Sequence, residues 1–299
     1  MTAARALPKQ AILIVNTKSR SGRDAFDRAR ELLTRSGVEL IAAKSVKQPS
    51  RIKAAVEKAI ANAPMVIIGG GDGTLSSAID LFKNSDTVFA ILPLGTANSF
   101  ARALGLPLGL EAAVKTIAEG VRRKIDLGCI NGDYFGNSAA VGLSPMIAKT
   151  IPRGLKKALG RAGYLIWAVR VAAAFRPFKV VVSDGRTRSD VWASEVRIAN
   201  GGYFGGVDIV HGAELDSGEI IVEVVATKTR RQLLASWLSS AFHLRSREEG
   251  MVEFRGRKLH LTTEPEMDVA IDGELATRTP ITVAVAHNAV EVAVPNQRD

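Results

Sequence analysis

Residues 65–80 read MVIIGGGDGTLSSAID, an apolar run followed by three glycines, an aspartate, a fourth glycine and a helix-like segment. This order places a glycine loop between a strand and a helix, where open parallel sheets bind ligands. Glycines let the backbone approach a phosphate closely, and N–H groups at the helix start stabilise its charge. Asp72 would repel phosphate directly, so the pattern predicts Mg²⁺ between them. A tight turn with Asp72 as helix cap is the competing interpretation.

The strand and helix signals on either side of this loop divide the chain into two regimes. Up to Ile125, β-branched runs alternate with helical patterns, which predicts a Rossmann-like α/β domain with a parallel sheet covered on both faces. After Asp126, alternating strands separated by Gly, Asp and Asn predict an antiparallel, β-rich, sandwich-like domain. Helical patterns at about 154–174 and 230–243 interrupt it. We therefore predict domains at 1–126 and 127–299, with a last strand that can return to the first domain.

The composition indicates a globular protein of a reducing compartment. The chain has 299 residues, a formal charge of +10 and one cysteine, Cys129, so it can form no intramolecular disulfide. The N-terminal segment lacks an apolar stretch of signal-peptide length, and the first apolar run is too short to span a bilayer. We expect a cytoplasmic protein.

Basic residues are concentrated in one segment. Residues 153–188 contain nine Lys or Arg and one acid, Asp184. The helical part of this segment also contains Leu, Tyr, Trp and Phe, a mixture typical of a helix at an anionic lipid surface. We expect peripheral membrane association in which Lys156, Lys157 and Arg161 contact headgroups. The alternative is a core helix with a solvated basic face. Nucleic acid is not an expected partner, because zinc-finger spacing and aromatic RNA-binding motifs are absent from the sequence.

The glycine loop is neither a dinucleotide-binding GxGxxG nor a Walker P-loop. GGGDGTL, followed one strand later by LPLGTANSFARALGLP (92–107), resembles the catalytic domain of lipid kinases of the diacylglycerol-kinase and sphingosine-kinase type. Further matching segments occur in the same order, and together they extend the resemblance over almost the whole chain: NTKSRSG (16–22), KIDLGCINGDYFGNSAAVG (124–142), ANGGYFGG (199–206), HGAELDSG (211–218) and VAIDGELAT (269–277). The likeness is greatest to soluble bacterial lipid kinases. It implies an N-terminal fold like that of NAD kinase and diacylglycerol kinase, with ATP and Mg²⁺ as cofactors.

The resemblance also implies a set of nucleotide-binding residues at the strand ends of the first domain. These are Asn16, Lys18, Ser21, Ser45, Gly69, Gly70, Gly71, Asp72, Gly73, Thr74, Leu75, Gly95, Thr96 and Asn98. Phosphoryl transfer to an alcohol needs a group that orients the hydroxyl, together with groups that offset the phosphoryl charge. The IDGE segment (271–274) resembles the catalytic acid segment of the family, which makes Asp272 and Glu274 catalytic candidates. Asp72 of the glycine loop is the third candidate. Without the resemblance, Asp-Gly is a hairpin-turn signal.

The same resemblance suggests a second cation site in the segment HGAELDSG. Asp216, Glu214 and Glu219 are its candidate ligands, and Asp126 is expected in the carboxylate network beside it. Two residues depart from the family pattern: Ser99 and Ser217 occupy positions where relatives commonly have Asp.

We expect an ATP-dependent lipid kinase that transfers the γ-phosphate to the hydroxyl of a membrane lipid such as diacylglycerol, a step of phospholipid biosynthesis. Its partner would be a lipid at an anionic membrane surface, and the sequence leaves open whether the chain forms a homodimer. A catalytically impaired nucleotide- or lipid-binding regulator is the first alternative, because of Ser99 and Ser217. A kinase of a sphingoid or other alcohol acceptor, or of a soluble substrate, is the second.

Overall fold

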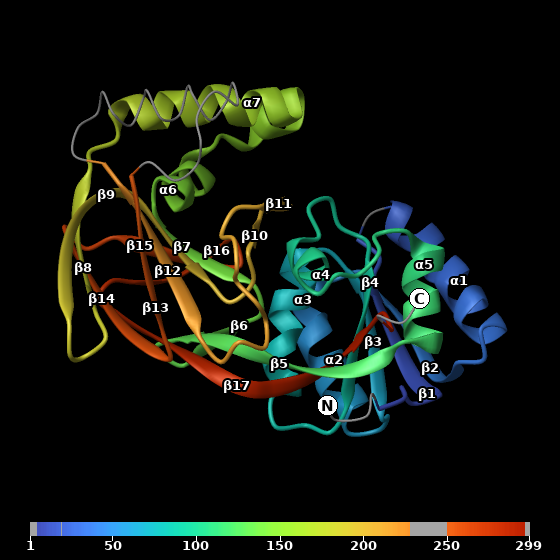
Figure 1. The fold of residues 1–299 in the computed structure, drawn as a ribbon. Helices are drawn as coiled ribbons and strands as arrows, with labels where there is room; N and C mark the ends of the chain where they lie inside the picture. Colours follow the sequence, from blue (N-terminus) through green and yellow to red (C-terminus); the bar gives the residue numbers. More distant parts are fainter. Residues whose placement is uncertain (1–4, 19, 228–249, 297–299) are drawn as a thin grey trace.

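The computed structural model describes residues 5–18, 20–227 and 250–296 (Figure 1). The helical pattern at 230–243 therefore lies outside the described residues. The first part of the chain forms parallel strands in the order β2-β1-β3-β4. Its elements are β1 (Gln10–Asn16), α1 (Arg20–Arg35), β2 (Glu39–Val46), the 3-10 helix η1 (Pro49–Arg51), α2 (Ile52–Ile60), β3 (Met65–Gly70), α3 (Asp72–Ile79), the 3-10 helix η2 (Asp80–Phe82), β4 (Val88–Pro93), α4 (Ser99–Ala103) and α5 (Leu110–Glu119).

Both faces of this parallel sheet are buried. All six residues of β3 are buried, as expected for a central strand that reads as a continuous apolar run. In β1, Ile12 and Ile14 pack into one core with α2, α3 and α4, whereas Leu13 and Val15 pack into the other with α1 and α5. The predicted α/β architecture of the first half is confirmed.

The second part of the chain is mostly antiparallel. Its elements are β5 (Val121–Ile130), β6 (Asp133–Phe135), β7 (Ser138–Gly142), α6 (Leu143–Thr150), α7 (Arg153–Ala174), β8 (Phe178–Ser183), β9 (Arg188–Ala199), β10 (Tyr203–Phe204), β11 (Val207–Asp208), β12 (Ile220–Ala226), β13 (Met251–Gly256), β14 (Lys258–Glu264), β15 (Asp268–Ile271), β16 (Glu274–Arg278) and β17 (Ile281–Val294). The long strand β9 pairs with β8 along its first half and with β7 and β12 along its second half.

Two sheets therefore share β9 and enclose one core. One sheet has the order β16-β15-β7-β9-β12-β13, and we call it the inner sheet; the other runs β9-β8-β14-β17-β5-β6. Side chains from both sheets, such as Val196 and Val283, meet in the apolar core between them. Helices α6 and α7 lie at one end of this sandwich (Figure 1). Ile147 of α6 and Phe175, directly after α7, pack into its core. The predicted β-rich, sandwich-like second half is confirmed.

Two long strands join the halves of the molecule. β17 pairs with β14 and β5, and its Val292 lies beside Phe89 of β4 in the parallel sheet. The predicted domain boundary after residue 126 falls inside β5. Because β5 and β17 run through both halves, the domain limits stay predictions. Among the described residues, no helix is long and apolar enough to cross a membrane.

Candidate active site

The carboxyl ends of the parallel strands place several predicted nucleotide-binding residues at one edge of the sheet. Asn16 ends β1, and its Nδ2 donates a hydrogen bond to Thr74 Oγ1 in α3 (2.9 Å). Its Oδ1 accepts the Lys18 backbone N–H (3.2 Å). Ser45, near the end of β2, is exposed and pairs with Val15 in β1. Strands β1 and β2 and helix α3 thus meet at one edge of the sheet, which is where open α/β sheets bind ligands.

The glycines of GGGDG lie where two loops touch. A Cβ on Gly70 would lie 2.6 Å from Thr74 Cβ, and a Cβ on Gly95 would lie 2.5 Å from Gly71 Cα. Asn98 closes the second loop, because its Oδ1 accepts the Gly95 N–H (2.8 Å) and its Nδ2 donates to the Gly95 carbonyl (2.9 Å). Internal packing therefore accounts for part of the glycine content.

Asp72 occupies the first turn of α3, where backbone N–H groups have no intrahelical partner. Its Oδ1 accepts the Phe100 backbone N–H (3.1 Å), which ties α3 to α4. Its Oδ2 accepts a hydrogen bond from no described residue, so one carboxylate oxygen is available to a ligand. Leu75 packs in the apolar core, so only its backbone can contact a nucleotide. Thr96 is exposed on the second loop.

Asp272 and Gly273 form the two-residue turn between β15 and β16, both with positive φ (46° and 90°). The hairpin interpretation is therefore correct, and the turn also delivers a carboxylate to the first half of the molecule. Asp272 Oδ1 accepts the Ser138 N–H (3.0 Å), and the Asp272 N–H donates to the Ser138 carbonyl (2.8 Å). Burial raises the pKa of the Asp272 carboxyl, although hydrogen bonds from Ser138 and the Ser76 side chain oppose the rise.

Glu274 directly follows this turn and approaches the glycine loop. Its Oε1 would lie 3.7 Å from a Cβ built on Gly73. The contacts of Asp272 with Ser76 and of Glu274 with Gly73 both reach α3. The structure thus brings all three catalytic candidates to the N-terminal end of one helix, with Asp72 supplied by the helix itself.

Asp126 belongs to a separate group, in β5. It is fully buried, its Oδ2 accepts the Gly218 N–H (2.6 Å), and its Oδ1 accepts the Asn288 N–H (2.7 Å). His287 Nδ1 lies 2.8 Å from the same Oδ1. Asp126 therefore fastens the segment that precedes β12 to an irregular part of β17.

The candidate ligands of the second cation site lie on the surface next to this group. Asp216 is paired with Arg123 through both carboxylate oxygens (2.7 and 3.0 Å), and Glu214 and Glu219 are exposed. Ser217 Oγ bonds within the loop, to the backbone of Glu219. The described part of the chain contains no group of three His, Cys, Asp or Glu side chains positioned to hold a metal ion. A cation in this loop stays a prediction.

Ser99, the other departure from the family pattern, joins the two halves. Its buried hydroxyl accepts the Gly206 N–H (2.9 Å) from the turn between β10 and β11. Asn200, also buried, donates from Nδ2 to the carbonyls of Asp126 and Gly136 (2.9 Å each). Asn200 therefore links the Asp126 group to the segment that holds Asp272.

Sequence reasoning did not assign roles to Ser76, Ser138 or Asn200. Ser138 and Asn200 occur in the segments FGNSAAVG and ANGGYFGG, which carry the family resemblance, so a search for polar residues inside those segments would have found them. Ser76 has no such signal, because only the fold places α3 beside the β15–β16 turn. The side chains of Ser21, Lys156, Lys157 and Arg161 lie outside the described part of the structure, although their backbone belongs to α1 and α7.

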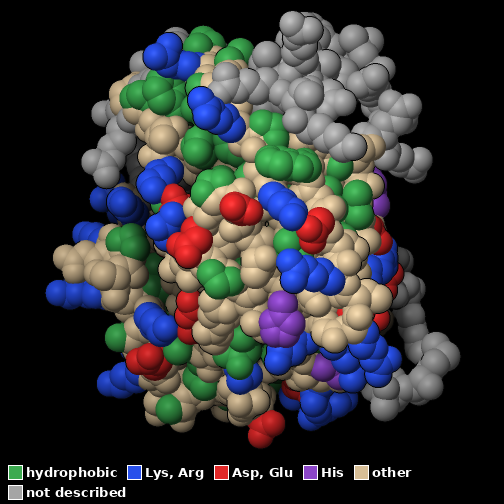
Figure 2. All heavy atoms as spheres, turned by 90° about the vertical axis from the view of Figure 1, so that its left-hand side faces the viewer, with side chains coloured by type: hydrophobic (Ala, Val, Ile, Leu, Met, Phe, Trp, Pro, Cys, Tyr) green, Lys and Arg blue, Asp and Glu red, His purple; other side chains and the backbone are tan. Residues whose placement is uncertain are grey.

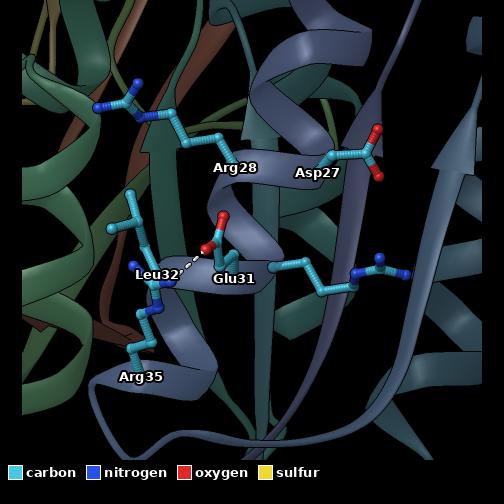
Figure 3. A pocket seen from close by; sticks show the side chains of 6 residues that line it. Asp27, Arg28, Glu31, Leu32 and Arg35 are labelled. Carbon is cyan, nitrogen blue, oxygen red and sulfur yellow. Dashed lines mark ion pairs between the residues drawn. The ribbon is translucent and has the colours of Figure 1, made fainter.

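A surface hollow along α1 does not belong to this site. Figure 3 shows its lining from one helix, with Glu31 and Arg35 joined in an ion pair (2.6 Å). Its lining residues are Asp27, Arg28, Arg30, Glu31, Leu32 and Arg35. None of the predicted catalytic or nucleotide-binding residues contributes to it.

Comparison with known proteins places this site in a family. Residues 10–130 match the diacylglycerol kinase catalytic domain, and residues 137–294, more than half of the chain, match the YegS C-terminal NAD kinase beta sandwich-like domain. The chain belongs to the diacylglycerol kinase and YegS-like family of lipid kinases.

Relatives of this lipid kinase match it nearly end to end. It is 24% identical to a diacylglycerol kinase of Bacillus subtilis (strain 168), over 97% of this chain and 98% of the relative. It is 29% identical to a "Probable lipid kinase YegS-like" of Pseudomonas aeruginosa (strain UCBPP-PA14), over 97% and 96% of the two chains. A crystal structure of a diacylglycerol kinase from Bacillus anthracis str. Sterne superposes with a TM-score of 0.76 at 21% identity, covering 97% of each chain, which shows the shared fold. Membership of a kinase family implies that this lipid kinase uses ATP.

Proposed function

We propose that this lipid kinase transfers the γ-phosphate of ATP to the hydroxyl of a membrane lipid such as diacylglycerol, with Mg²⁺. The observation that carries the proposal is the meeting of Asp272 with α3, because it joins a desolvated carboxylate from one half to the glycine loop of the other. A base with a raised pKa beside a phosphate-binding loop is the arrangement that phosphoryl transfer to an alcohol needs.

Asp72 is the residue that would hold Mg²⁺. Its Oδ1 is used by Phe100, and its Oδ2 has no partner among the described residues, so one oxygen fits a hard cation. One carboxylate is enough for a magnesium ion whose other ligands are phosphate oxygens and water, as is common in kinases. The bound ion would offset negative charge on the phosphoryl group during transfer.

The protein's own groups would perform the remaining steps. Backbone N–H groups at the start of α3 bind phosphate oxygens, and Asn16 with Thr74 fixes the adjoining strand end. Asp272 accepts the proton of the lipid hydroxyl as the oxygen bonds to the γ-phosphorus, and the bond to the β-phosphate oxygen breaks to release ADP. Glu274, beside Gly73, assists in orienting the hydroxyl.

The test is transfer of labelled γ-phosphate from ATP to a total lipid extract in mixed micelles with Mg²⁺. We expect a labelled lipid from the wild-type protein and none from Asp72→Asn. Asp86→Asn, the same substitution at an exposed position after η2, is the matched control and retains transfer. ATP binding without any labelled product would instead favour a non-catalytic regulator or a water-soluble acceptor.

We further propose that α7 docks the enzyme on anionic membranes. In the described half of this helix, Ile166 and Val169 are 59% and 46% exposed, and Arg170 beside them is exposed within 5.9 Å of the Trp167 ring. Figure 2 shows hydrophobic and basic side chains together in the upper part of this face, with acidic side chains lower down. Apolar side chains flanked by cations suit the boundary between headgroups and acyl chains.

Vesicle co-sedimentation tests the docking. Replacing Ile166 and Val169 with Asp should reduce binding to phosphatidylglycerol-containing vesicles at least tenfold. Ile41→Asp, at an exposed apolar position of β2, serves as the control and should leave binding unchanged. Equal binding by all three proteins, insensitive to salt, would reject docking through α7.

A further inference from the structure

A partly buried charged cluster lies on the inner sheet and takes no part in the transfer chemistry described above. Arg197 of β9 donates from Nε to Glu195 Oε1 (3.1 Å) and from Nη1 to Glu223 Oε2 (2.9 Å). Ser144, at the start of α6, donates to Glu195 Oε2 (2.8 Å). We call Glu195, Arg197 and Glu223 the charged triad.

Strand alternation places the triad on the same face as Asp272. Val196 and Ile198 of β9 lie in the sandwich core, so Glu195 and Arg197 point to the opposite face of the inner sheet. In β12, Val222 and Val224 lie in that core, so Glu223 also points away from it. In β15, Val269 and Ile271 are core residues, which directs Ala270 and the following Asp272 to the face of the triad.

The strand registers also set the spacing between the triad and Asp272. Ser138, whose N–H binds the Asp272 carboxylate, pairs with Ala199, so Arg197 is the diagonal neighbour of Ser138 at about 7–8 Å, and Asp272 lies one strand farther away. Ala270 of β15 pairs with Ala140 of β7, which in turn pairs with Arg197 of β9, so these three residues form one row across the sheet. The residues of this row between Arg197 and the far edge of β15 thus have small side chains.

The triad keeps hydrogen-bonding and charge capacity. About 20% of the Arg197 side chain is exposed, and its Nη2 donates to no described residue. Glu223 is 9% exposed at the side chain, and only its Oε2 has a described partner. Burial alone would lower the pKa of the Arg197 guanidinium, but the Glu195 and Glu223 carboxylates raise it above its usual value. Two carboxylates with one guanidinium leave a formal charge of −1.

We propose that the charged triad selects the acceptor lipid: it binds the uncharged polar group next to the reacting hydroxyl, an ester carbonyl or a second hydroxyl, and rejects lipids with a phosphate there. This inference rests on the proposed function and narrows its substrate class. Arg197 Nη2 donates to the neutral acceptor, and Glu223 accepts from a hydroxyl. A phosphodiester would add negative charge beside two carboxylates in a partly desolvated place, where repulsion is strong.

Calorimetric titration of lipid binding without ATP tests the selection separately from catalysis. The probes are dihexanoylglycerol and dihexanoylphosphatidylglycerol, both below their micelle concentrations. We expect the wild-type protein to bind the neutral lipid at least tenfold more tightly. Glu223→Gln should narrow that ratio to threefold or less, mainly by improving binding of the anionic lipid, and Glu195→Gln should act in the same direction.

Glu253→Gln is the matched control, because Glu253 is the cross-strand neighbour of Glu223 on β13 and is paired with Arg255 at the surface. The ratio of the affinities of Glu253→Gln for the neutral and the anionic lipid should equal that of the wild-type protein. The inference is overturned if the wild-type protein binds neither lipid or binds both equally, whichever variants fold, or if Glu223→Gln leaves the ratio unchanged. Selective binding without phosphoryl transfer would instead retain the triad's role and refute the proposed kinase reaction.

Discussion

Asp126 and Asp272 are both largely withdrawn from water at the junction of the two halves, yet they lie among different neighbours. Asp126 is surrounded by donors: two backbone N–H groups and the His287 ring contact its oxygens. Asp272 accepts hydrogen bonds from neutral groups, and among the described residues no Lys, Arg or His pairs with it. Burial alone does not mark a catalytic carboxylate. What distinguishes the two is their neighbours: the His287 ring contacts Asp126, whereas Asp272 contacts Ser76 of α3 beside the glycine loop.

This difference predicts a structural role for Asp126 and a chemical role for Asp272. A buried carboxylate that accepts hydrogen bonds from two separate segments stabilises the loops that it joins. A desolvated carboxylate without a cation has a raised pKa and gains from taking a proton, as a general base must. The substitutions below test the comparison from its largest expected effect to its smallest.

Asp272→Asn should give the largest effect. The amide keeps the shape and the hydrogen bond from Ser138 but cannot accept the hydroxyl proton, so we expect kcat to fall about 10³-fold, within the usual range for loss of a general base. The melting temperature should change by only a few degrees. Asp268→Asn, in the same strand but ion-paired with Lys149, is the control and should retain kcat. Similar turnover in both variants would refute the role of Asp272.

Asp126→Asn should separate stability from chemistry. In the wild-type protein the backbone N–H groups of Gly218 and Asn288 donate to the Asp126 carboxylate. An Asn amide would point its own N–H at one of these donors, which should lower the free energy of unfolding by about 3 kcal/mol. The kcat of the folded fraction should stay within about threefold of the wild-type value. Urea unfolding together with turnover per folded molecule measures both quantities. A large loss of kcat in fully folded protein would place Asp126 in the chemistry after all.

The pH dependence of stability provides a third test, because the Asp272 carboxyl binds its proton differently in the folded and unfolded states. The pKa of Asp272 is raised above its usual value of 3.8, so the folded state holds this proton more tightly than the unfolded state. That contribution to stability is present below pH 3.8 and is lost as the pH rises through the raised pKa. The unfolding free energy of the wild-type protein should therefore fall relative to Asp272→Asn as pH rises, while kcat rises. Parallel stability curves would contradict a desolvated Asp272.

The regularities of the first half were predictable because its strands are buried on both faces and read as unbroken apolar runs. MVIIGG and the helix that follows it are examples. In the second half, the pattern of YFGNSAAVG is that of one strand, but the structure divides it into β6 and β7 around Gly136 and Asn137. The interruption lets the backbone of Gly136 and Asn137 hydrogen-bond to the Asp272 carboxylate. The sequence of β16, ELATR, does not indicate a strand, because it is mostly exposed and lacks alternation.

The site itself was predictable only as far as its residues share a local motif. The glycine loop and IDGE could be identified from short segments, whereas the contact between α3 and the β15–β16 turn depends on pairing across the whole chain. The charged triad is a clearer case. Glu195 lies beside Arg197 because both point to the same face of β9, two residues apart, but only the pairing of β12 with β9 brings the distant Glu223 to Arg197.

The smallest expected effect concerns Asp216, which pairs with Arg123 beside the Asp126 group. Both side chains are about one-third exposed, and exposed ion pairs contribute little, so Asp216→Asn should lower the free energy of unfolding by less than about 1 kcal/mol. The loss should shrink further in high salt, because screening weakens the wild-type pair. Thermal unfolding at low and high salt measures this loss, and a parallel series with a chelator tests for a bound cation; Asp86→Asn, at an exposed position, is the surface control. If chelation destabilises the wild-type protein but not Asp216→Asn, a cation occupies this loop, and the contrast between the two acidic groups must include a metal.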